Sequence, residues 1–226
     1  MSDAPLRLVI FDVDGTLVDS QADIIGAMTL AFAAEDLAMP DRATVLAQVG
    51  LSLHVMMPRL VPQADAATHG RLVEGYKAAY MQLRATRGAA ESSPMYPGAL
   101  QTLQRLHAQP EVLLGVATGK SRRGLDKLIE GHALEGLFVT QQVADTHPSK
   151  PHPAMLEAAL SETGVEAVHA VMVGDTSYDM EMAASAGITG IAVSWGYHDR
   201  TQLGAATHLI EDFAALPPLL EDIWKE

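Results

Sequence analysis

Three aspartates stand close together near the start of the chain, in the segment VIFDVDGTLVDS at residues 9–20. Asp12 and Asp14 directly follow an apolar run, and Asp19 comes shortly afterwards. In an extended chain, side chains two positions apart share a face, so Asp12 and Asp14 can point the same way. Their charges repel each other unless a cation joins them. The alternative is a Val-Asp-Gly-Thr turn with solvated carboxylates, and this segment alone does not decide between the two.

Three later segments place further polar groups at the ends of predicted strands or in a stiff loop. They are the segments GVATGK, HPSKPHP and VMVGDTSYD. The residues of interest in them are Thr118, Gly119, Lys120, Lys150, Asp175 and Asp179. Because open parallel sheets bind ligands at the carboxyl ends of their strands, we expect these residues to meet the first aspartates at one site.

Together these groups suit phosphoryl chemistry. Asp12 and Asp175 could hold Mg²⁺, which prefers oxygen ligands and would cancel the repulsion between the carboxylates. A phosphoryl group would find a hydrogen-bond donor in Thr118 and a counter-charge in Lys150. Asp12 could attack phosphorus, while the metal and the lysine offset charge on the phosphoryl oxygens. Asp14 could protonate the leaving oxygen and later activate water.

The elements that must position these groups change character along the chain. Residues 6–11 predict a short buried strand, and apolar residues at helical spacing over 20–87 predict about four helices, separated by proline and glycine. Residues 88–98 are rich in small and turn-forming residues and predict a linker. Beyond it, helices are expected at 98–108, after Ser121, at 153–162, 177–186 and 213–224, and strands at 112–118, 137–140, 170–174, 190–194 and 208–210. This alternation predicts an α/β fold with a parallel sheet covered on both faces.

Composition narrows the classes of function. The chain has 226 residues, a formal net charge of −13 and no cysteine. The acidic balance argues against nucleic-acid or membrane-surface partners, and the lack of cysteine excludes disulfides, thiol nucleophiles and Cys-based zinc sites. The N-terminal segment resembles no signal peptide, and no apolar run reaches the ~18 residues of a membrane span. We therefore expect a cytoplasmic protein whose partner is a small molecule; the oligomeric state is not indicated.

Four segments, taken in order, resemble the four motifs of the haloacid dehalogenase-like hydrolase superfamily: DVDGT, ATGK, SKPHP and GDTSYD. The resemblance extends from residue 8 to about residue 195. Two longer segments, DVDGTLVDSQADI and GDTSYDMEMAASAG, are similar to those of bacterial phosphoglycolate phosphatases. The resemblance implies a Rossmann-like parallel-sheet core, residues 1–18 and 94–226, interrupted by a helical-bundle cap, residues 19–93. The cap would govern substrate selectivity.

The resemblance also implies roles for individual residues. Asp12 would be the nucleophile, Asp14 the acid and base, and Thr118 and Lys150 the phosphate binders. Apart from the resemblance, we expect Gly119 and Lys120, which follow Thr118 in the sequence, to adjoin them in the substrate site. Mg²⁺ would be bound by the Asp12 carboxylate, the Asp14 backbone carbonyl and Asp175, with Asp179 in support. The expected activity is Mg²⁺-dependent hydrolysis of a small phosphomonoester, phosphoglycolate first, through a phospho-aspartyl intermediate.

Other activities within and beyond the superfamily fit less well. Dehalogenases resemble these phosphatases but lack the second aspartate, which is Asp14 here, and need no metal. Phosphonoacetaldehyde hydrolases use an early cap lysine, and no lysine lies between Asp19 and Lys77. β-Phosphoglucomutase-like members carry a histidine soon after the first motif, where DSQADI has none. A phosphomutase is therefore the second candidate, after a phosphatase. Signalling receiver domains use similar residues around Mg²⁺ but are shorter and have no cap.

The role of Lys120 has two interpretations. Lys120, Arg122 and Arg123 crowd the first turn of a predicted helix, where cations oppose the helix dipole. Lys120 could therefore face an anion, such as a carboxylate or second phosphate of the substrate. The alternative is a surface cluster balanced by Asp126 and Glu130.

The predicted cap offers one loop that could reach the site. It is VGLS at 49–52, followed by His54 and Arg59; alternatively, Gly50 only ends one helix and Ser52 caps the next. His147 and His152, which flank Lys150, lack the context of a zinc site and are interpreted as loop histidines. Trp195 and Tyr197 follow a predicted strand and could edge the site, whereas residues 200–226 show no chemistry.

Overall fold

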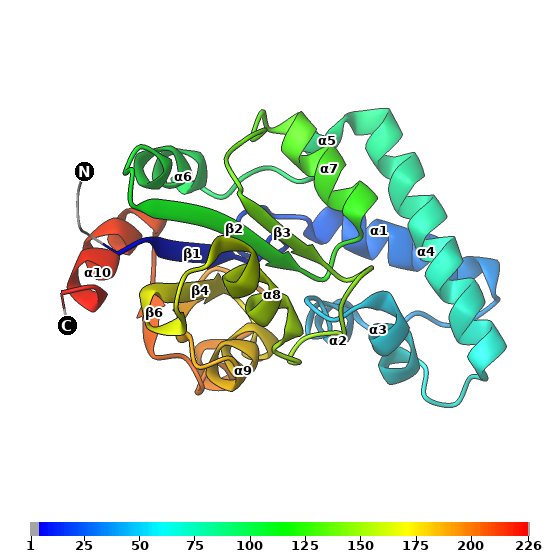
Figure 1. Ribbon diagram of the computed structural model, residues 1–226. Helices are drawn as coiled ribbons and strands as arrows, with labels where there is room; N and C mark the ends of the chain where they lie inside the picture. The colour runs from blue at the N-terminus through cyan, green and yellow to red at the C-terminus, as the bar shows by residue number, and fades with distance from the viewer. Residues whose placement is uncertain (1–4, 226) are drawn as a thin grey trace.

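Six parallel strands form one sheet in the computed structural model, which describes residues 5–225 (Figure 1). The strands are β1 (Arg7–Phe11), β2 (Val112–Thr118), β3 (Thr140–Val143), β4 (Ala170–Gly174), β5 (Thr189–Val193) and β6 (His208–Ile210). Their order across the sheet is β3-β2-β1-β4-β5-β6. The strand order reverses between β1 and β4, and open α/β sheets bind ligands at such a switch point.

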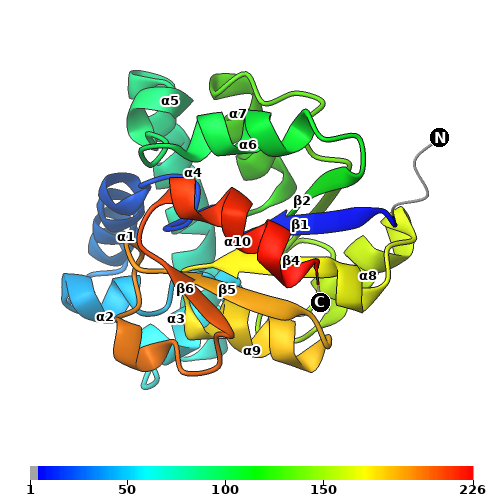
Figure 2. The same cartoon turned by 90° about the vertical axis from the view of Figure 1, so that its left-hand side faces the viewer.

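Helices cover both faces of this sheet, as Figures 1 and 2 show. One face packs against α6 (Ala99–His107), α7 (Arg122–Gly131) and α10 (Leu216–Ile223). The other packs against α8 (Ala154–Thr163) and α9 (Ser177–Ser185). Because both faces are covered, the central strands are almost entirely apolar, as in RLVIF of β1, where every residue after Arg7 is buried. The expected α/β fold with a parallel, Rossmann-like sheet is confirmed.

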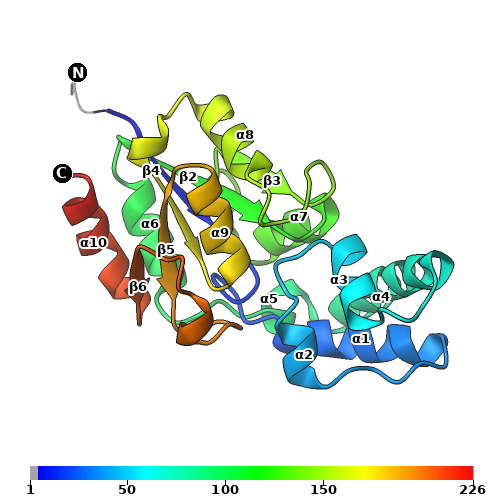
Figure 3. The ribbon, with the colours of Figure 1, turned by 90° about the horizontal axis from the view of Figure 1, so that it is seen from below.

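A second group of helices lies beside the carboxyl ends of the strands (Figure 3). It consists of α1 (Gln21–Ala34), α2 (Arg42–Leu46), α3 (Leu53–Leu60), α4 (Ala66–Arg87) and the short α5 (Ala89–Ser92). These helices have an apolar core of their own, in which Met28, Phe32, Met57 and Leu72 are fully buried. Asp41 and Asp65 begin α2 and α4 by accepting hydrogen bonds from the backbone N–H groups of Thr44 and Thr68, both at 2.8 Å.

The chain passes between the sheet and this helical group twice, and the two crossings lie side by side. Val18 forms a β-bridge with Met95. The Asp19 N–H donates to the Pro94 carbonyl at 2.9 Å, and the Tyr96 N–H donates to the Leu17 carbonyl at 3.0 Å. A pair of adjacent connections therefore joins the helical group to the sheet.

The structure corrects one predicted strand. The apolar run LFVT at 137–140 suggested a strand there, but β3 begins only at Thr140 and continues through TQQV. Phe138 lies in the turn before β3, and its side chain is buried in the core between the sheet and the helices α6, α7 and α10. The hydrophobic signal therefore belongs to this turn, while the edge strand itself is polar. Two smaller differences are α5 within the predicted linker and a 3₁₀ turn, Phe213–Ala215, before the last helix.

Among residues 5–225, no helix combines the length and the apolar composition needed to cross a membrane.

Candidate active site

Adjacent strands bring the predicted site residues to one edge of the sheet. Phe11 at the end of β1 is in register with Val116 of β2 on one side and with Val173 of β4 on the other. Asp12 therefore emerges between the ends of β2 and β4. Thr118 is the last residue of β2, and Asp175 directly follows β4.

Lys150 is fully buried between two carboxylates. Its Nζ donates to Asp12 Oδ1 and to Asp179 Oδ1, both at 2.6 Å. Burial disfavours the ammonium, but the charges of Asp12 and Asp179 outweigh this effect and raise the pKa of Lys150. The lysine is therefore a fixed positive charge beside Asp12.

Asp179 is held by the start of its own helix. Its Oδ2 accepts hydrogen bonds from the Thr176 N–H at 3.0 Å and from the Thr176 hydroxyl at 2.6 Å, which forms a capping box at the first turn of α9. Its other oxygen accepts from Lys150. Because both oxygens have partners, Asp179 positions Lys150 next to Asp12, and the T-x-x-D spacing in GDTSYD is the local signal for this arrangement.

A cation would fit among the buried carboxylates. One oxygen atom each of Asp12, Asp175 and Asp179 lie within 4.8 Å of one another. Asp12 Oδ2 is buried and has no hydrogen-bond partner within residues 5–225. A buried carboxylate oxygen without a partner is costly, and oxygen donors suit a hard cation such as Mg²⁺.

The electrostatics of the same carboxylates also favour a cation. Burial raises the pKa of Asp12 to about 7; Lys150 opposes the rise, and the charge of Asp179 adds to it. Burial also raises the pKa of Asp175, with further contributions from Asp12 and Asp179. Lys150 alone therefore does not balance the negative charge that these side chains carry when ionised.

The carboxylate of Asp175 lies in a close-fitting cradle. It accepts hydrogen bonds from the Thr16 hydroxyl at 3.2 Å and from the Tyr197 N–H at 2.8 Å. A Cβ atom on Gly15 or Gly196 would lie 2.2 or 2.4 Å from Asp175 Oδ2. Gly15 also has φ of +87°, a conformation that side chains disfavour. Both glycines are therefore required for the carboxylate to keep this position.

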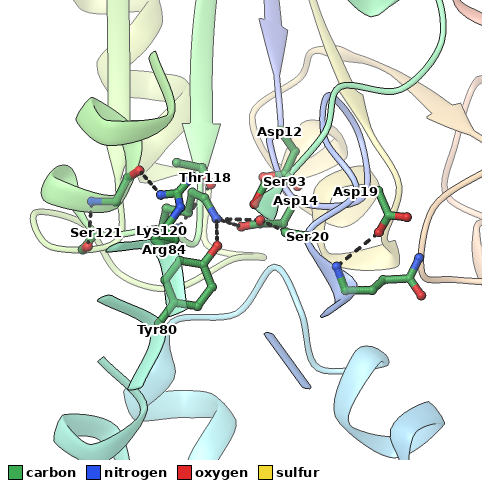
Figure 4. A network of polar contacts seen from close by, with 12 residues as sticks. Asp12, Asp14, Asp19, Ser20, Tyr80, Arg84, Ser93, Thr118, Lys120 and Ser121 are labelled. Atoms are coloured by element: carbon green, nitrogen blue, oxygen red, sulfur yellow. Dashed lines mark hydrogen bonds and ion pairs between the residues drawn. The ribbon is translucent and has the colours of Figure 1, made fainter. Parts of the chain in front are cut away.

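Asp14 belongs to a second network that joins the two parts of the molecule (Figure 4). Lys120 Nζ donates to both Asp14 oxygens, at 2.6 and 2.8 Å, and to the Tyr80 hydroxyl of α4 at 3.2 Å. The Ser20 hydroxyl donates to Asp14 Oδ1 from the other side and is itself 3.1 Å from the Tyr197 hydroxyl. Asp14 is thus held on both sides.

Lys120 is not part of a surface cluster. Its side chain is buried, and although burial disfavours its charge, Asp14 and Tyr80 outweigh this and raise its pKa. Its partner is a carboxylate of the chain itself, so the expected role toward a substrate anion stays a prediction. The neighbouring Arg122 does fit the alternative interpretation, because it lies 3.6 Å from Asp126 on the exposed face of α7.

Thr118 and Gly119 complete the floor of the site. Thr118 is fully buried, and its hydroxyl oxygen accepts from the Lys120 N–H at 3.2 Å. A Cβ on Gly119 would lie 2.7 Å from the Gly50 carbonyl oxygen, so this glycine allows the loop 49–52 to approach the sheet closely. Nearby, the Ser52 N–H donates to the Ser149 hydroxyl at 2.8 Å.

Both interpretations of the loop 49–52 hold in part. Gly50, with φ of +99°, does not end α2, whose C-cap is Ala47, whereas Ser52 does occupy the N-cap position of α3, although its side chain makes no capping bond. The same loop lines the cavity that contains Asp12 and Asp14. The two residues expected beside it lie elsewhere: His54 is exposed, and Arg59 contacts the Tyr178 hydroxyl of α9 at 3.3 Å.

The loop histidines take no part in the carboxylate cluster. His147 Nε2 lies 2.8 Å from Gln142 Oε1, and His152 Nδ1 accepts from the Ala154 N–H at 3.2 Å.

Sequence reasoning missed several supporting residues. Thr16 and Ser20 lie in the same segment as the first aspartates, and their hydroxyl groups were the only signal available. Tyr80 lies on a helix far along the chain, and nothing in its surroundings in the sequence indicates a contact with Lys120. The backbone N–H of Tyr197 gives no sequence signal, whereas its side chain does edge the site as expected.

Comparison with known proteins decides the family. A sequence model of the haloacid dehalogenase-like hydrolase family matches residues 9–193. The chain belongs to this family. The resemblance inferred from the four motifs is therefore confirmed, and with it the expectation of a hydrolase whose relatives are phosphatases.

Two curated relatives match over most of their length. One, named probable phosphatase IndB, from Dickeya dadantii, is 37% identical over 205 residues, covering 88% of this chain and 86% of the relative. The other, a phosphoglycolate phosphatase from Rhodospirillum rubrum, is 36% identical over 222 residues, covering 93% and 89%.

Solved structures share the fold at lower identity. A predicted phosphoglycolate phosphatase from Haemophilus somnus has a TM-score of 0.83 at 23% identity, covering 96% of this chain and 99% of that one. A β-phosphoglucomutase from Clostridium difficile has a TM-score of 0.81 at 16% identity, covering 97% of each. These two likenesses concern the fold alone, since phosphatase and mutase share it.

Proposed function

We propose that this enzyme is a Mg²⁺-dependent phosphatase that hydrolyses a small phosphomonoester through a phosphorylated Asp12. The observation that carries the proposal is the environment of Asp12. One carboxylate oxygen is bound by Lys150 at 2.6 Å, and the other is buried without a partner in the described chain. One oxygen of the Asp12 carboxylate lies within 4.8 Å of an oxygen of Asp175. The phosphatase relatives supply the reaction class.

Asp12 and Asp175 would hold the metal, with the backbone carbonyl of Asp14 as a further ligand; Asp179, whose oxygens are engaged, would support it through Lys150. When bound, Mg²⁺ offsets negative charge on the phosphoryl oxygens.

The residues of the chain carry the remaining steps. A carboxylate oxygen of Asp12 attacks phosphorus and the ester P–O bond breaks, while Asp14 gives a proton to the leaving oxygen. Lys150, and Thr118 through its hydroxyl, bind the phosphoryl oxygens. In the second step Asp14 takes a proton from a water molecule that attacks the phosphorus, and inorganic phosphate and free Asp12 result.

We propose further that residues 19–93 form a cap that can move relative to a core of residues 1–18 and 94–226. The support is the pair of adjacent crossings at Val18 and Met95, where the two parts are joined. Such a cap can close over bound ester and exclude water. Cytoplasmic location and the absence of nucleic-acid partners stay predictions.

The test is phosphate release from a panel of phosphomonoesters, phosphoglycolate included, with Mg²⁺ and with chelator. Asp12→Asn should abolish turnover. Asp19→Asn is the matched control, because its carboxylate belongs to the same segment but accepts from the Gln21 N–H at the start of α1, at 3.2 Å. Transfer of phosphate between positions of a sugar phosphate without net release would instead identify a mutase.

A further inference from the structure

A large cavity lies between the two parts of the molecule and opens onto the carboxylates. Its volume is about 560 Å³, and Asp12, Asp14, Gly119 and Lys120 form its floor. Cavities of a few hundred Å³ and more accommodate drug-sized molecules. A two-carbon ester such as phosphoglycolate would leave most of this volume empty, so the cavity accommodates a larger leaving group.

The wall opposite the floor is mainly apolar. Its side chains come from α1, the start of α3 and the middle of α4: Ile24, Leu53, Met56, Tyr76, Tyr80 and Met81. Ile24 and Met56 are almost fully buried, whereas Met81 is 42% exposed at one edge. A leaving group that contacts this wall gains by removing apolar surface from water.

Two tyrosines on α4 give this wall a flat aromatic part. Tyr76 and Tyr80 lie one helical turn apart, with ring centroids separated by 5.8 Å and planes inclined by 30°. The Tyr80 hydroxyl is tied to Lys120, which in turn binds Asp14, so this ring has a fixed place beside the reacting groups (Figure 4). Aromatic rings favour offset or edge contacts with other rings.

Three of the basic residues that line the cavity pair with carboxylates of the chain, and two of these pairs are exposed. Lys120 is bound to Asp14. Lys77 lies 2.8 Å from Glu74, and Lys127 lies 2.5 Å from Glu130.

Arg84 is only partly engaged. It donates to the Gly124 carbonyl at 3.1 Å and packs over the Tyr80 ring at 5.4 Å, whereas its other two nitrogen atoms, Nε and Nη2, are buried without a hydrogen-bond partner among residues 5–225. Arg123 is exposed. The cavity therefore combines its apolar wall with two arginines that form no ion pair within the described residues.

We propose that the preferred ester carries a ring in its leaving group, and that an apolar face of this ring packs against Tyr76 and Tyr80. This inference rests on the proposed phosphatase activity and names the class of leaving group. Tyr76 and Tyr80 are then specificity-determining residues. Tyr76 would determine specificity through contact with the ring of the leaving group alone, whereas Tyr80 also orients Lys120.

The experiment compares three alkyl phosphomonoesters, namely ethyl phosphate, phosphoglycolate and 2-phenylethyl phosphate. We expect kcat/KM for the 2-phenylethyl ester to exceed both others by at least about tenfold, since burial of a single methylene in a fitted pocket already changes rates by ~10-fold or more. Tyr76→Ala should remove most of this preference, and Tyr76→Phe, which keeps the ring, should retain it.

Two results would overturn the inference while leaving the phosphatase intact. One is Asp12-dependent release with phosphoglycolate or ethyl phosphate equal to or better than the 2-phenylethyl ester. The other is an equal loss for all three esters in Tyr76→Ala. Absence of release from every ester would instead refute the proposed function. In that case calorimetric binding of the same esters to Asp12→Asn still tests the cavity, and equal affinities would refute the preference for a ring.

Discussion

Replacing the proposed nucleophile should stabilise the metal-free protein. Asp12 is fully buried, and its pKa rises from 3.8 to about 7, chiefly because burial disfavours the carboxylate. Each pKa unit of difference between the folded and unfolded chain corresponds to about 1.4 kcal/mol. Ionising Asp12 therefore costs the metal-free fold about 4 kcal/mol above pH 7.

The sign follows from which state binds the proton more tightly. Because the folded pKa is raised, the folded chain holds a proton on Asp12 that the unfolded chain releases near pH 4. The stability that the folded chain gains by keeping Asp12 protonated is fully present below about pH 4 and is lost as the pH rises through about 7. Asp12→Asn cannot ionise, so the variant should escape this loss.

Thermal unfolding in chelator at pH 5 and pH 8 tests the argument. At pH 8, Asp12→Asn should unfold roughly 8–16 °C above the wild type, since 1 kcal/mol shifts the midpoint by about 2–4 °C in a chain of this size. At pH 5 the gain should be less than half as large. Asp126→Asn, an exposed carboxylate on α7, is the control. A gain that is absent at pH 8, or equal at both pH values, would refute the reasoning.

Three further predictions concern the same site. Mg²⁺ at a hundred times its dissociation constant should raise the unfolding midpoint by roughly 5–10 °C, which corresponds to ~2.7 kcal/mol of stabilisation. Measured by differential scanning calorimetry, this rise should be larger at pH 8 than at pH 6, because the metal binds ionised carboxylates. An equal rise at both pH values would contradict this. Gly15→Ala should abolish the Mg²⁺ response and destabilise the fold more than the control Gly164→Ala. The new Cβ at position 15 would lie 2.2 Å from Asp175, whereas Gly164 has a similar positive φ and a Cβ there would have no atom within 4 Å. Equal unfolding midpoints of the two variants would show that the cradle of Asp175 tolerates a side chain. Lys120→Met should lower kcat by roughly 10- to 100-fold through loss of the contact with Asp14, with KM changed less; steady-state kinetics that show only a rise in KM would assign Lys120 to substrate binding instead.

Much of the fold followed from periodicity and punctuation. Apolar runs such as RLVIF and AVMVG are buried on both faces, which is why they could be identified as central strands. The polar edge strand β3 could not, because an edge strand needs little apolar surface, and the apolar run beside it fills the core from a turn. The helical insert was evident from its spacing, but how it packs against the sheet was not.

The proposed site shows the same division. Residue types and strand-end positions were enough to single out Asp12, Thr118 and Asp175, because parallel strands deliver their carboxyl ends to one edge. Lys150 was singled out by its place in a loop stiffened by prolines. Contacts made across long separations in the sequence were not accessible, such as Lys120 with Tyr80 and Asp175 with the Tyr197 backbone.

The sequence by itself determined the α/β class, the insertion of helices after the first strand and the chemical groups available at the strand ends, since each depends on local spacing. Only the tertiary structure decided that Lys120 faces Asp14, that Asp179 holds Lys150, and that the cavity wall is aromatic. The physical reason is that hydrogen bonds and packing join side chains from separate elements, and their partners are set by how those elements come together.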